Sequence, residues 1–164
     1  MSVHTGTTRV FEEIAVGDEV TPLVRGPLTT THLMRWSAAI ENWHRIHYDA
    51  PFATEHDGLP ALLVNGSWKQ HVLVQMMRRW LGPGGWLAHV RFQFRGMNVV
   101  GETLTAHGTV KETYERDGLG FVVCEIGIWN ERQEESTPGE ATGVLPLAGG
   151  PPVPYPFPAD ALER

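Results

Sequence analysis

Eight consecutive residues, NWHRIHYD at positions 42–49, concentrate side chains that can carry out acid–base chemistry. They include His44 and His47, whose imidazole groups gain or lose a proton near neutral pH and can therefore act as a general acid or base. An asparagine, an arginine, a tyrosine and an aspartate accompany them. Polar residues at this density mark either a solvated corner of the fold or a functional site.

A second candidate is the run Asn65-Gly66-Ser67, which precedes a long apolar pattern. The first N–H groups of a helix have no partner within the helix, and the helix dipole favours negative charge there. A glycine at position 66 lets another molecule approach the backbone closely. This run could therefore stabilise a developing negative charge, as an oxyanion hole does.

Two predicted helices position these runs. Thr29, Thr30 and Thr31 offer N-cap hydroxyls for the first helix, and NWHRIHYD should form its end and exit loop. Its apolar stripe at helical spacing consists of Leu33, Trp36, Ile40 and Trp43. The second helix is predicted from Ser67, as N-cap, to Leu81, because Gly82-Pro83 stops it. Its broad apolar face consists of Trp68, Val72, Leu73, Met76, Met77 and Trp80.

The predicted strands surround the second helix. One is expected from about Asp18 to Val24, and β-branched or aromatic-rich runs separated by turn residues follow the helix. These runs are WLAHVRFQFRG, ETLTAHGTVKETYE, GLGFVVCEIGIWNE and ATGVLPL. An antiparallel sheet wrapped around one buried helix is an α+β architecture. We predict one domain over residues 1–147 and a proline-rich tail over residues 148–164, extended on the surface or mobile.

Composition excludes several classes of protein. The 164 residues suit one domain, and the net charge of -6 argues against nucleic-acid binding, which needs a basic face. Cys124 is the single cysteine and lies in an apolar run, so we expect a core residue in a reducing compartment rather than a disulfide. Apolar stretches fall short of the roughly 18 residues of a membrane span, and the N-terminus lacks a signal-type apolar region. We therefore expect a cytoplasmic protein without a membrane or nucleic-acid partner.

Two segments, WSAAIENWHRIHYDAPFA and GLPALLVNGSW, together resemble the signature of the MaoC-like hydratases and dehydratases. The likeness covers roughly Phe11 to Val110 and is nearest the branch of 3-hydroxyacyl-thioester dehydratases and mesaconyl-CoA hydratases. It implies a hotdog fold, in which a curved antiparallel sheet wraps a central helix. It also implies hydration of 2-enoyl thioesters, or dehydration of 3-hydroxyacyl thioesters, on acyl-CoA or acyl-ACP and without a cofactor.

The reaction that this resemblance implies adds water at C3 and a proton at C2, through an enolate-like thioester oxygen. It needs a base and hydrogen-bond donors for the developing oxyanion. By the resemblance, His47 is the general acid/base, the Gly66 N–H is an oxyanion donor and Asn42 orients the water. The expected substrate contacts are Asn65, Arg45, Tyr48 and Ser67.

Two positions depart from the family pattern. Many members have an aspartate where this chain has Asn42, and His-Gly-Pro where it has Asn65-Gly66-Ser67. An amide orients water but cannot take its proton, so His47 would act alone or with Glu41 or Asp49. Asn65 can donate a hydrogen bond but not a proton.

Simpler roles are expected for the neighbours of His47. His44 should be structural, Arg45 should form a surface ion pair unless it binds CoA phosphates, and Asp49 should cap the turn before Pro51. A zinc site made of His44, His47 and Asp49 would lack a fourth ligand, so we expect no metal.

Two other functions remain open. A hotdog thioesterase would need a carboxylate placed for attack of water at the carbonyl, and Glu41 is the candidate. A catalytically silent subunit, which binds an acyl thioester or completes the tunnel of a partner, is favoured by Asn42 and Asn65. In each case an uncovered sheet edge predicts a homodimer, or a heterodimer with another hotdog subunit.

Overall fold

Five strands form one antiparallel sheet in the computed structural model, which describes residues 9–158. The order across the sheet is β1-β3-β4-β5-β2, so β1 and β2 are its edges. The strands are β1 (Glu19–Arg25), β2 (Trp86–Phe92), β3 (Leu104–Arg116), β4 (Leu119–Trp129) and β5 (Gly139–Pro146). One strand precedes the long helix and four follow it. The predicted α+β architecture is therefore confirmed, and strand ends differ from the expected ones by a few residues.

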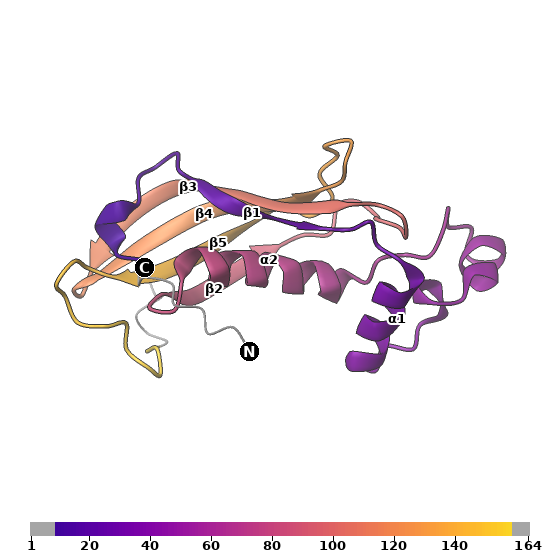
Figure 1. The fold of residues 1–164 in the computed structure, drawn as a ribbon, viewed down its shortest axis with the longest axis horizontal. Coiled ribbons are helices and arrows are strands. Elements are labelled where there is room, and N and C mark those ends of the chain that lie inside the picture. The colour runs from indigo at the N-terminus through magenta and orange to yellow at the C-terminus, as the bar shows by residue number, and fades with distance from the viewer. Residues whose placement is uncertain (1–8, 159–164) are drawn as a thin grey trace.

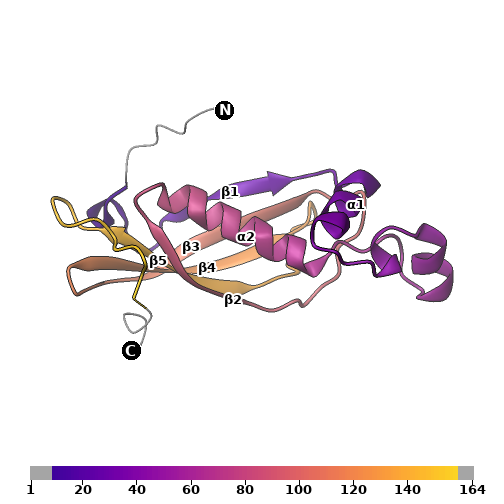
Figure 2. The same cartoon turned by 90° about the horizontal axis from the view of Figure 1, so that it is seen from below.

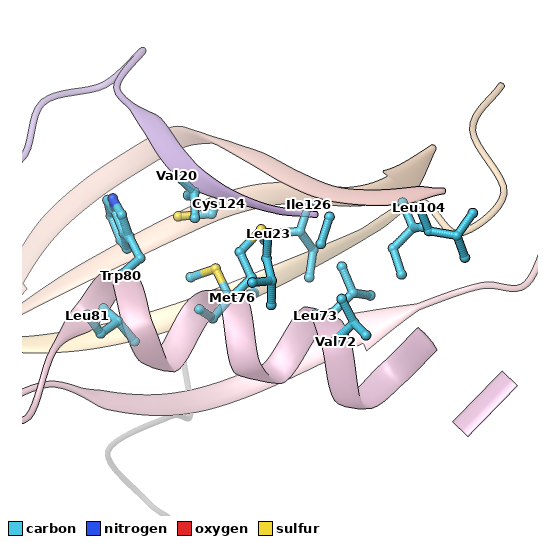
Figure 3. Packing of buried hydrophobic residues seen from close by; sticks show 14 of the residues in the cluster. Val20, Leu23, Val72, Leu73, Met76, Trp80, Leu81, Leu104, Cys124 and Ile126 are labelled. Atoms are coloured by element: carbon cyan, nitrogen blue, oxygen red, sulfur yellow. The ribbon is translucent and has the colours of Figure 1, made fainter. Parts of the chain in front are cut away.

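The long helix α2 (Gly66–Leu81) lies along one face of the curved sheet (Figures 1 and 2). Side chains of its inner face meet apolar side chains of the strands (Figure 3). Its buried residues are Lys69, Val72, Leu73, Met76, Met77, Trp80 and Leu81. Each large apolar side chain buried in this way stabilises the fold by roughly 1.5–3 kcal/mol. Within residues 9–158, no helix is long and apolar enough to cross a membrane.

Cys124 lies on β4 within this core and is fully buried. Burial raises the pKa of its thiol to about 12, because the apolar surroundings disfavour the thiolate. The expectation of a core cysteine is confirmed.

The first helix, α1 (Thr30–Ala39), is shorter than predicted. It begins as expected, because Thr29 is the N-cap and its side chain pairs with His32 in a capping box. It ends at Ala39, since Ile40 leaves helical geometry and Glu41 adopts a left-handed backbone with a φ of 53°. The predicted apolar stripe is therefore wrong beyond Ala39, where Ile40 and Trp43 are exposed.

The segment after β5 packs on the other face of the sheet. Val153 and Phe157 contact a second apolar cluster built on Leu119, Phe121 and Val144. The Phe157 ring also stacks on Trp86 of β2, with ring centroids 6.3 Å apart. The described part of the proline-rich tail thus lies on the surface of the sheet, and residues 159–164 of that predicted tail lie outside the described residues.

Candidate active site

His47 belongs to a short 3-10 helix, Arg45–His47, and its side chain is buried. The ring Nδ1 lies 2.8 Å from the carbonyl oxygen of Leu63, and the Leu63 N–H donates to the Ile46 carbonyl at 3.0 Å. Because a carbonyl oxygen can only accept, Nδ1 must carry the proton, and Nε2 of the neutral ring is left as the acceptor. This contact therefore leaves Nε2 of His47 as the nitrogen that can accept a proton.

The extended segment Leu62–Val64 connects His47 to the start of α2. On its other side, the Val64 N–H donates to the Asn98 carbonyl at 2.8 Å, and the Val100 N–H donates to the Leu62 carbonyl at 2.9 Å. The segment is thus held from both sides, and Asn65 and Gly66 follow it directly. Figures 1 and 2 show α1 and the segment after it beyond this N-terminal end of α2.

The N-terminus of α2 differs by two residues from the predicted one. Asn65, not Ser67, is the N-cap, and its Oδ1 accepts a hydrogen bond from the Ser67 N–H at 3.2 Å. Gly66 is the first helical residue, and the structure shows no hydrogen-bond partner for its N–H within residues 9–158. A Cβ at this position would lie 2.8 Å from Cζ of Phe94, so any larger residue would displace this aromatic ring.

A chain of hydrogen bonds orients the Asn65 amide. Trp36 Nε1 of α1 donates to Ser67 Oγ at 2.9 Å, and Ser67 Oγ donates to Asn65 Oδ1 at 2.7 Å. These bonds identify the amide oxygen and direct the amide nitrogen away from them. Asn65 Nδ2 is buried and has no hydrogen-bond partner in the described part of the chain, which costs about 1–3 kcal/mol unless something accepts its hydrogens. The amide is therefore a donor prepared for an acceptor from outside the chain.

Lys69 was missed by the sequence reasoning. It is buried on the inner face of α2, and its Nζ donates to the Gly96 carbonyl at 3.0 Å and to Asn98 Oδ1 at 3.2 Å. The ammonium also lies 5.2 Å from the centroid of the Phe94 ring. Lys69 thus binds residues 94–98, the segment whose Phe94 ring lies against Gly66. Its signal in the sequence is its spacing, three and four residues before Val72 and Leu73 on the apolar face.

Burial of Lys69 makes stability depend on pH. Desolvation lowers the pKa of Lys69 from 10.5 to about 8, and the carboxylate of Glu102 opposes this only in part. Between these two values the unfolded chain binds more protons than the folded one, so the free energy of unfolding should rise with pH. We expect the free energy of unfolding of the wild type to rise by about 1–3 kcal/mol over this pH range, and the Lys69→Met variant to lack this rise.

Urea denaturation of both proteins at about pH 7 and about pH 10 measures this difference. The matched control is Lys111→Met, which removes an exposed lysine that pairs with Glu125 at 3.6 Å. An equal change in the free energy of unfolding with pH in the wild type and in Lys69→Met would contradict the expected cost of burying Lys69.

Other residues of the NWHRIHYD segment hold the loop in shape. Asn42 Oδ1 accepts from the His44 N–H at 3.2 Å, and His44 Nδ1 accepts from the Ile46 N–H at 3.4 Å. The Tyr48 hydroxyl donates to the Trp43 carbonyl at 2.7 Å. His44 is therefore structural, as expected, and Asn42 and Tyr48 have structural contacts of their own.

Arg45 and Asp49 form the expected surface ion pair. The shortest distance joins Arg45 Nη2 and Asp49 Oδ2, at 2.6 Å, and the guanidinium also stacks 4.3 Å from the centroid of the Phe52 ring. The hydrogen bond from Arg45, and then that from the Phe52 N–H, lower the pKa of Asp49. Asp49 caps the turn as predicted, and as an ion-paired carboxylate of lowered pKa it is a poorer base than His47.

A groove of about 450 Å³ lies between α1, α2 and the end of β1. Its charged and aromatic lining consists of Arg25, His32, Arg35, Trp36, Trp68 and His71. His32, Trp36 and Trp68 also line a separate, very small cavity beside Asn65. Residues 9–158 contain no group of three or more His, Cys, Asp or Glu side chains placed to hold a metal ion.

The fold agrees with comparisons to known proteins. Residues 15–102, more than half of the chain, match the family model of hydroxyacyl-thioester dehydratase type 2. The chain therefore belongs to this family of hotdog hydratases and dehydratases that act on acyl thioesters. The predicted MaoC-like family and hotdog fold are thus confirmed.

Individual relatives resemble this chain over a short segment or at low sequence identity. The mesaconyl-C(4)-CoA hydratase of Chloroflexus aurantiacus is 44% identical over 46 residues, which are 28% of this chain and only 16% of that protein. The unliganded R-hydratase PhaJ1 from Pseudomonas aeruginosa superimposes with a TM-score of 0.75 at 17% identity, over 85% of this chain and 86% of that chain. The ChsH1-ChsH2 complex from Mycobacterium tuberculosis gives a TM-score of 0.68 at 16% identity, over 80% of this chain and 98% of that chain. At these identities the two structures support the fold alone.

Proposed function

We propose that this chain hydrates 2-enoyl thioesters, or dehydrates 3-hydroxyacyl thioesters, with His47 as the general acid/base. The observation that carries the proposal is the 2.8 Å contact between His47 Nδ1 and the Leu63 carbonyl, because it leaves Nε2 free to take a proton. Family membership supports the thioester chemistry. The carrier is CoA or acyl carrier protein, and the hydratase name of the Chloroflexus relative supports CoA.

In the hydration direction, His47 Nε2 takes a proton from water while the water oxygen bonds to C3 of the enoyl group. The electron pair of the C2–C3 double bond moves toward the thioester carbonyl, whose oxygen becomes negative. The Gly66 N–H and Asn65 Nδ2 donate hydrogen bonds to that oxygen, and the helix dipole of α2 adds favourable potential. The proton then adds to C2, and dehydration follows the same steps in reverse.

The remaining predicted site residues have supporting roles in this proposal. Ser67 acts through Asn65, because its hydroxyl and N–H both bind the amide oxygen. Tyr48 and Arg45 lie in the same loop as His47 and are proposed to contact the carrier end of the substrate. Arg45 could bind a CoA phosphate only by sharing its guanidinium with Asp49.

Hydration of crotonyl-CoA and longer enoyl-CoAs by the purified protein, with free thiol measured in parallel, tests the proposal. Loss of the enoyl absorbance without thiol release supports a hydratase. Thiol release would identify the thioesterase alternative, in which Glu41 is the candidate carboxylate. No turnover of these substrates would favour the silent subunit, for which Asn42 and Asn65 are the sequence arguments.

Asn42 provides a graded test of the proposed water site. Asn42→Ala should lower kcat less than loss of His47, because it removes orientation of the water but no proton transfer. Asn42→Asp should keep or raise kcat, because it adds a carboxylate that many relatives have at this position. Steady-state kinetics of the two variants measure both effects. A large loss of activity in Asn42→Asp, in a protein that unfolds like the wild type, would contradict the proposed placement of water.

We propose in addition that the chain pairs with a second hotdog subunit, either its own copy or a homologous partner. Among residues 9–158 no strand pairs with the outer side of the edge strand β2, and the exposed apolar residues Trp86, Phe94 and Met97 lie on this strand or follow it. The two-subunit name of the ChsH1-ChsH2 complex supports such pairing. Sedimentation at micromolar concentration should show a dimer. A monomer would refute the homodimer, and solubility only with a co-expressed relative would favour the heterodimer.

A further inference from the structure

Lys69 is a buried cation in an apolar position of α2. It is 3% exposed and shares the inner face of the helix with Val72 and Leu73 (Figure 3). Within residues 9–158 no carboxylate forms an ion pair with it, and Glu102 acts on it only from a greater distance. An apolar side chain of similar length would avoid the cost of burying such a charge. Packing of the core alone therefore does not explain a lysine here.

The ammonium of Lys69 orients the side chain of Asn98, which is 1% exposed. Asn98 Oδ1 accepts from Lys69 Nζ at 3.2 Å, and Asn98 Nδ2 donates to Glu102 Oε2 at 2.8 Å. Because an ammonium can only donate and a carboxylate can only accept, these two partners identify the amide atoms. Lys69 Nζ also binds the Gly96 carbonyl at 3.0 Å, so it holds the backbone just before Asn98 as well.

The backbone of Asn98 connects this network to the candidate site. Its carbonyl oxygen accepts from the Val64 N–H at 2.8 Å. On one side of Val64, the Leu63 carbonyl lies 2.8 Å from His47 Nδ1, and on the other side the chain reaches Gly66 after two residues. A shift of Asn98 would therefore move the proposed base and the proposed oxyanion donor relative to each other.

The same ammonium restrains the aromatic ring beside Gly66. Lys69 Nζ lies 5.2 Å from the centroid of the Phe94 ring, and that ring occupies the space where a Cβ of residue 66 would point. Lys69 follows Gly66 by three residues, or about 4.5 Å along the helix axis. One side chain thus restrains both the start of its own helix and the segment that packs on it.

We propose that Lys69 is a positioning residue for the reaction: acting through Asn98, it holds the Leu63 carbonyl and the Gly66 N–H at the separation that hydration requires. Lys69 itself lies in the core, away from the substrate. The inference rests on the proposed function, because this separation matters only if His47 and Gly66 act on the same thioester. Loss of the link should lower kcat and leave KM nearly unchanged, since a small misplacement of reacting groups slows the chemical step more than it weakens binding.

Steady-state kinetics of Lys69→Met, on the enoyl-CoA that the wild type hydrates fastest, test the inference. We expect kcat to fall by about tenfold or more and KM to stay within about twofold. Lys111→Met makes the same substitution at an exposed lysine of β3 and should keep both constants. Asn98→Ala removes the link but leaves Lys69 bound to Gly96, and it should lower kcat by a similar factor. In the double variant kcat should fall no further than in the more impaired single variant, because both changes break the same link.

Two NMR resonances report the geometry without catalysis. The backbone N–H of Gly66 and the Nδ1–H of His47 should both shift in Lys69→Met and in Asn98→Ala, and should stay unchanged in Lys111→Met. Unfolding by urea, measured alongside, shows that each variant is folded. If Lys69→Met does not fold, Asn98→Ala carries the same test.

Each other outcome overturns a defined statement. Wild-type kcat in folded Lys69→Met or Asn98→Ala would overturn the inference and leave the proposed function intact. Independent losses that multiply in the double variant, or a fall in kcat while both resonances stay unchanged, would overturn the route through Asn98. A wild type that hydrates none of the enoyl-CoAs would overturn the proposed function and this inference with it.

Discussion

Replacing His47 by alanine should lower kcat for hydration of an enoyl-CoA by about 10² to 10⁴-fold while the fold persists. In the proposed mechanism the imidazole takes the proton of water through Nε2, since Nδ1 is bound to the Leu63 carbonyl. Steady-state kinetics on crotonyl-CoA, with the unfolding midpoint measured alongside, give the result. The loss should fall on kcat rather than on KM, because proton transfer belongs to the transition state.

Two further variants separate catalysis from structure at this position. His47→Asn keeps a side-chain N–H that can donate to the Leu63 carbonyl, and it should be as inactive as alanine. His44→Ala removes the neighbouring imidazole, which only caps the Ile46 N–H, and it should keep most of the activity. Full activity in His47→Ala would move the base to Glu41 or Asp49 and end the proposed mechanism.

Replacing Asn65 by aspartate should lower kcat by about 10² to 10³-fold, the usual effect of losing one oxyanion donor. The two side chains have nearly the same shape, and a carboxylate oxygen can still accept from the Ser67 N–H as an N-cap. What disappears is the donor at Nδ2, which is buried without a hydrogen-bond partner among residues 9–158. In its place stands an oxygen that repels a developing oxyanion.

The Asn65→Asp test is informative because the two roles of the residue diverge. A purely structural N-cap would tolerate aspartate, so kinetics close to those of the wild type would refute the role as donor. Asn65→Ser retains a capping oxygen on a shorter side chain and lacks the amide donor, and it should lose a similar factor. Thermal unfolding of each variant shows whether the helix start has survived.

Local pattern was sufficient to predict the architecture. The repeat of Val72, Met76 and Trp80 at four-residue spacing, closed by Gly82, predicted a buried helix whose N-cap lies two residues earlier than expected. The aromatic and β-branched runs around it determined the strands, because these residues suit a pleated and partly buried surface. Such periodicity depends on neighbours along the chain, so it can be read without knowing the partners of each element.

The local pattern failed where loop hydrogen bonds or contacts between distant residues decide the structure. Ile40 and Trp43 continue the helical spacing of α1, but the helix stops at Ala39 and leaves both exposed. Asn42 and His44 instead bind the backbone of the loop, which brings the short helix of His47 against Leu63. Lys69 takes a core position because Gly96 and Asn98, far away in sequence, supply its acceptors.

The residues of the candidate site could be proposed from the sequence, since His47, Asn65 and Gly66 lie in two recognisable runs. Their chemical states were decided by tertiary contacts. The Leu63 carbonyl selects the tautomer of His47, and Trp36 acts through Ser67 to turn the Asn65 amide. The charged groove likewise exists only because β1, α1 and α2 converge, and no single stretch of sequence contains both Arg25 and His71. Hydrogen bonds and unpaired charges depend on which atoms meet in space, and separation along the chain does not encode that.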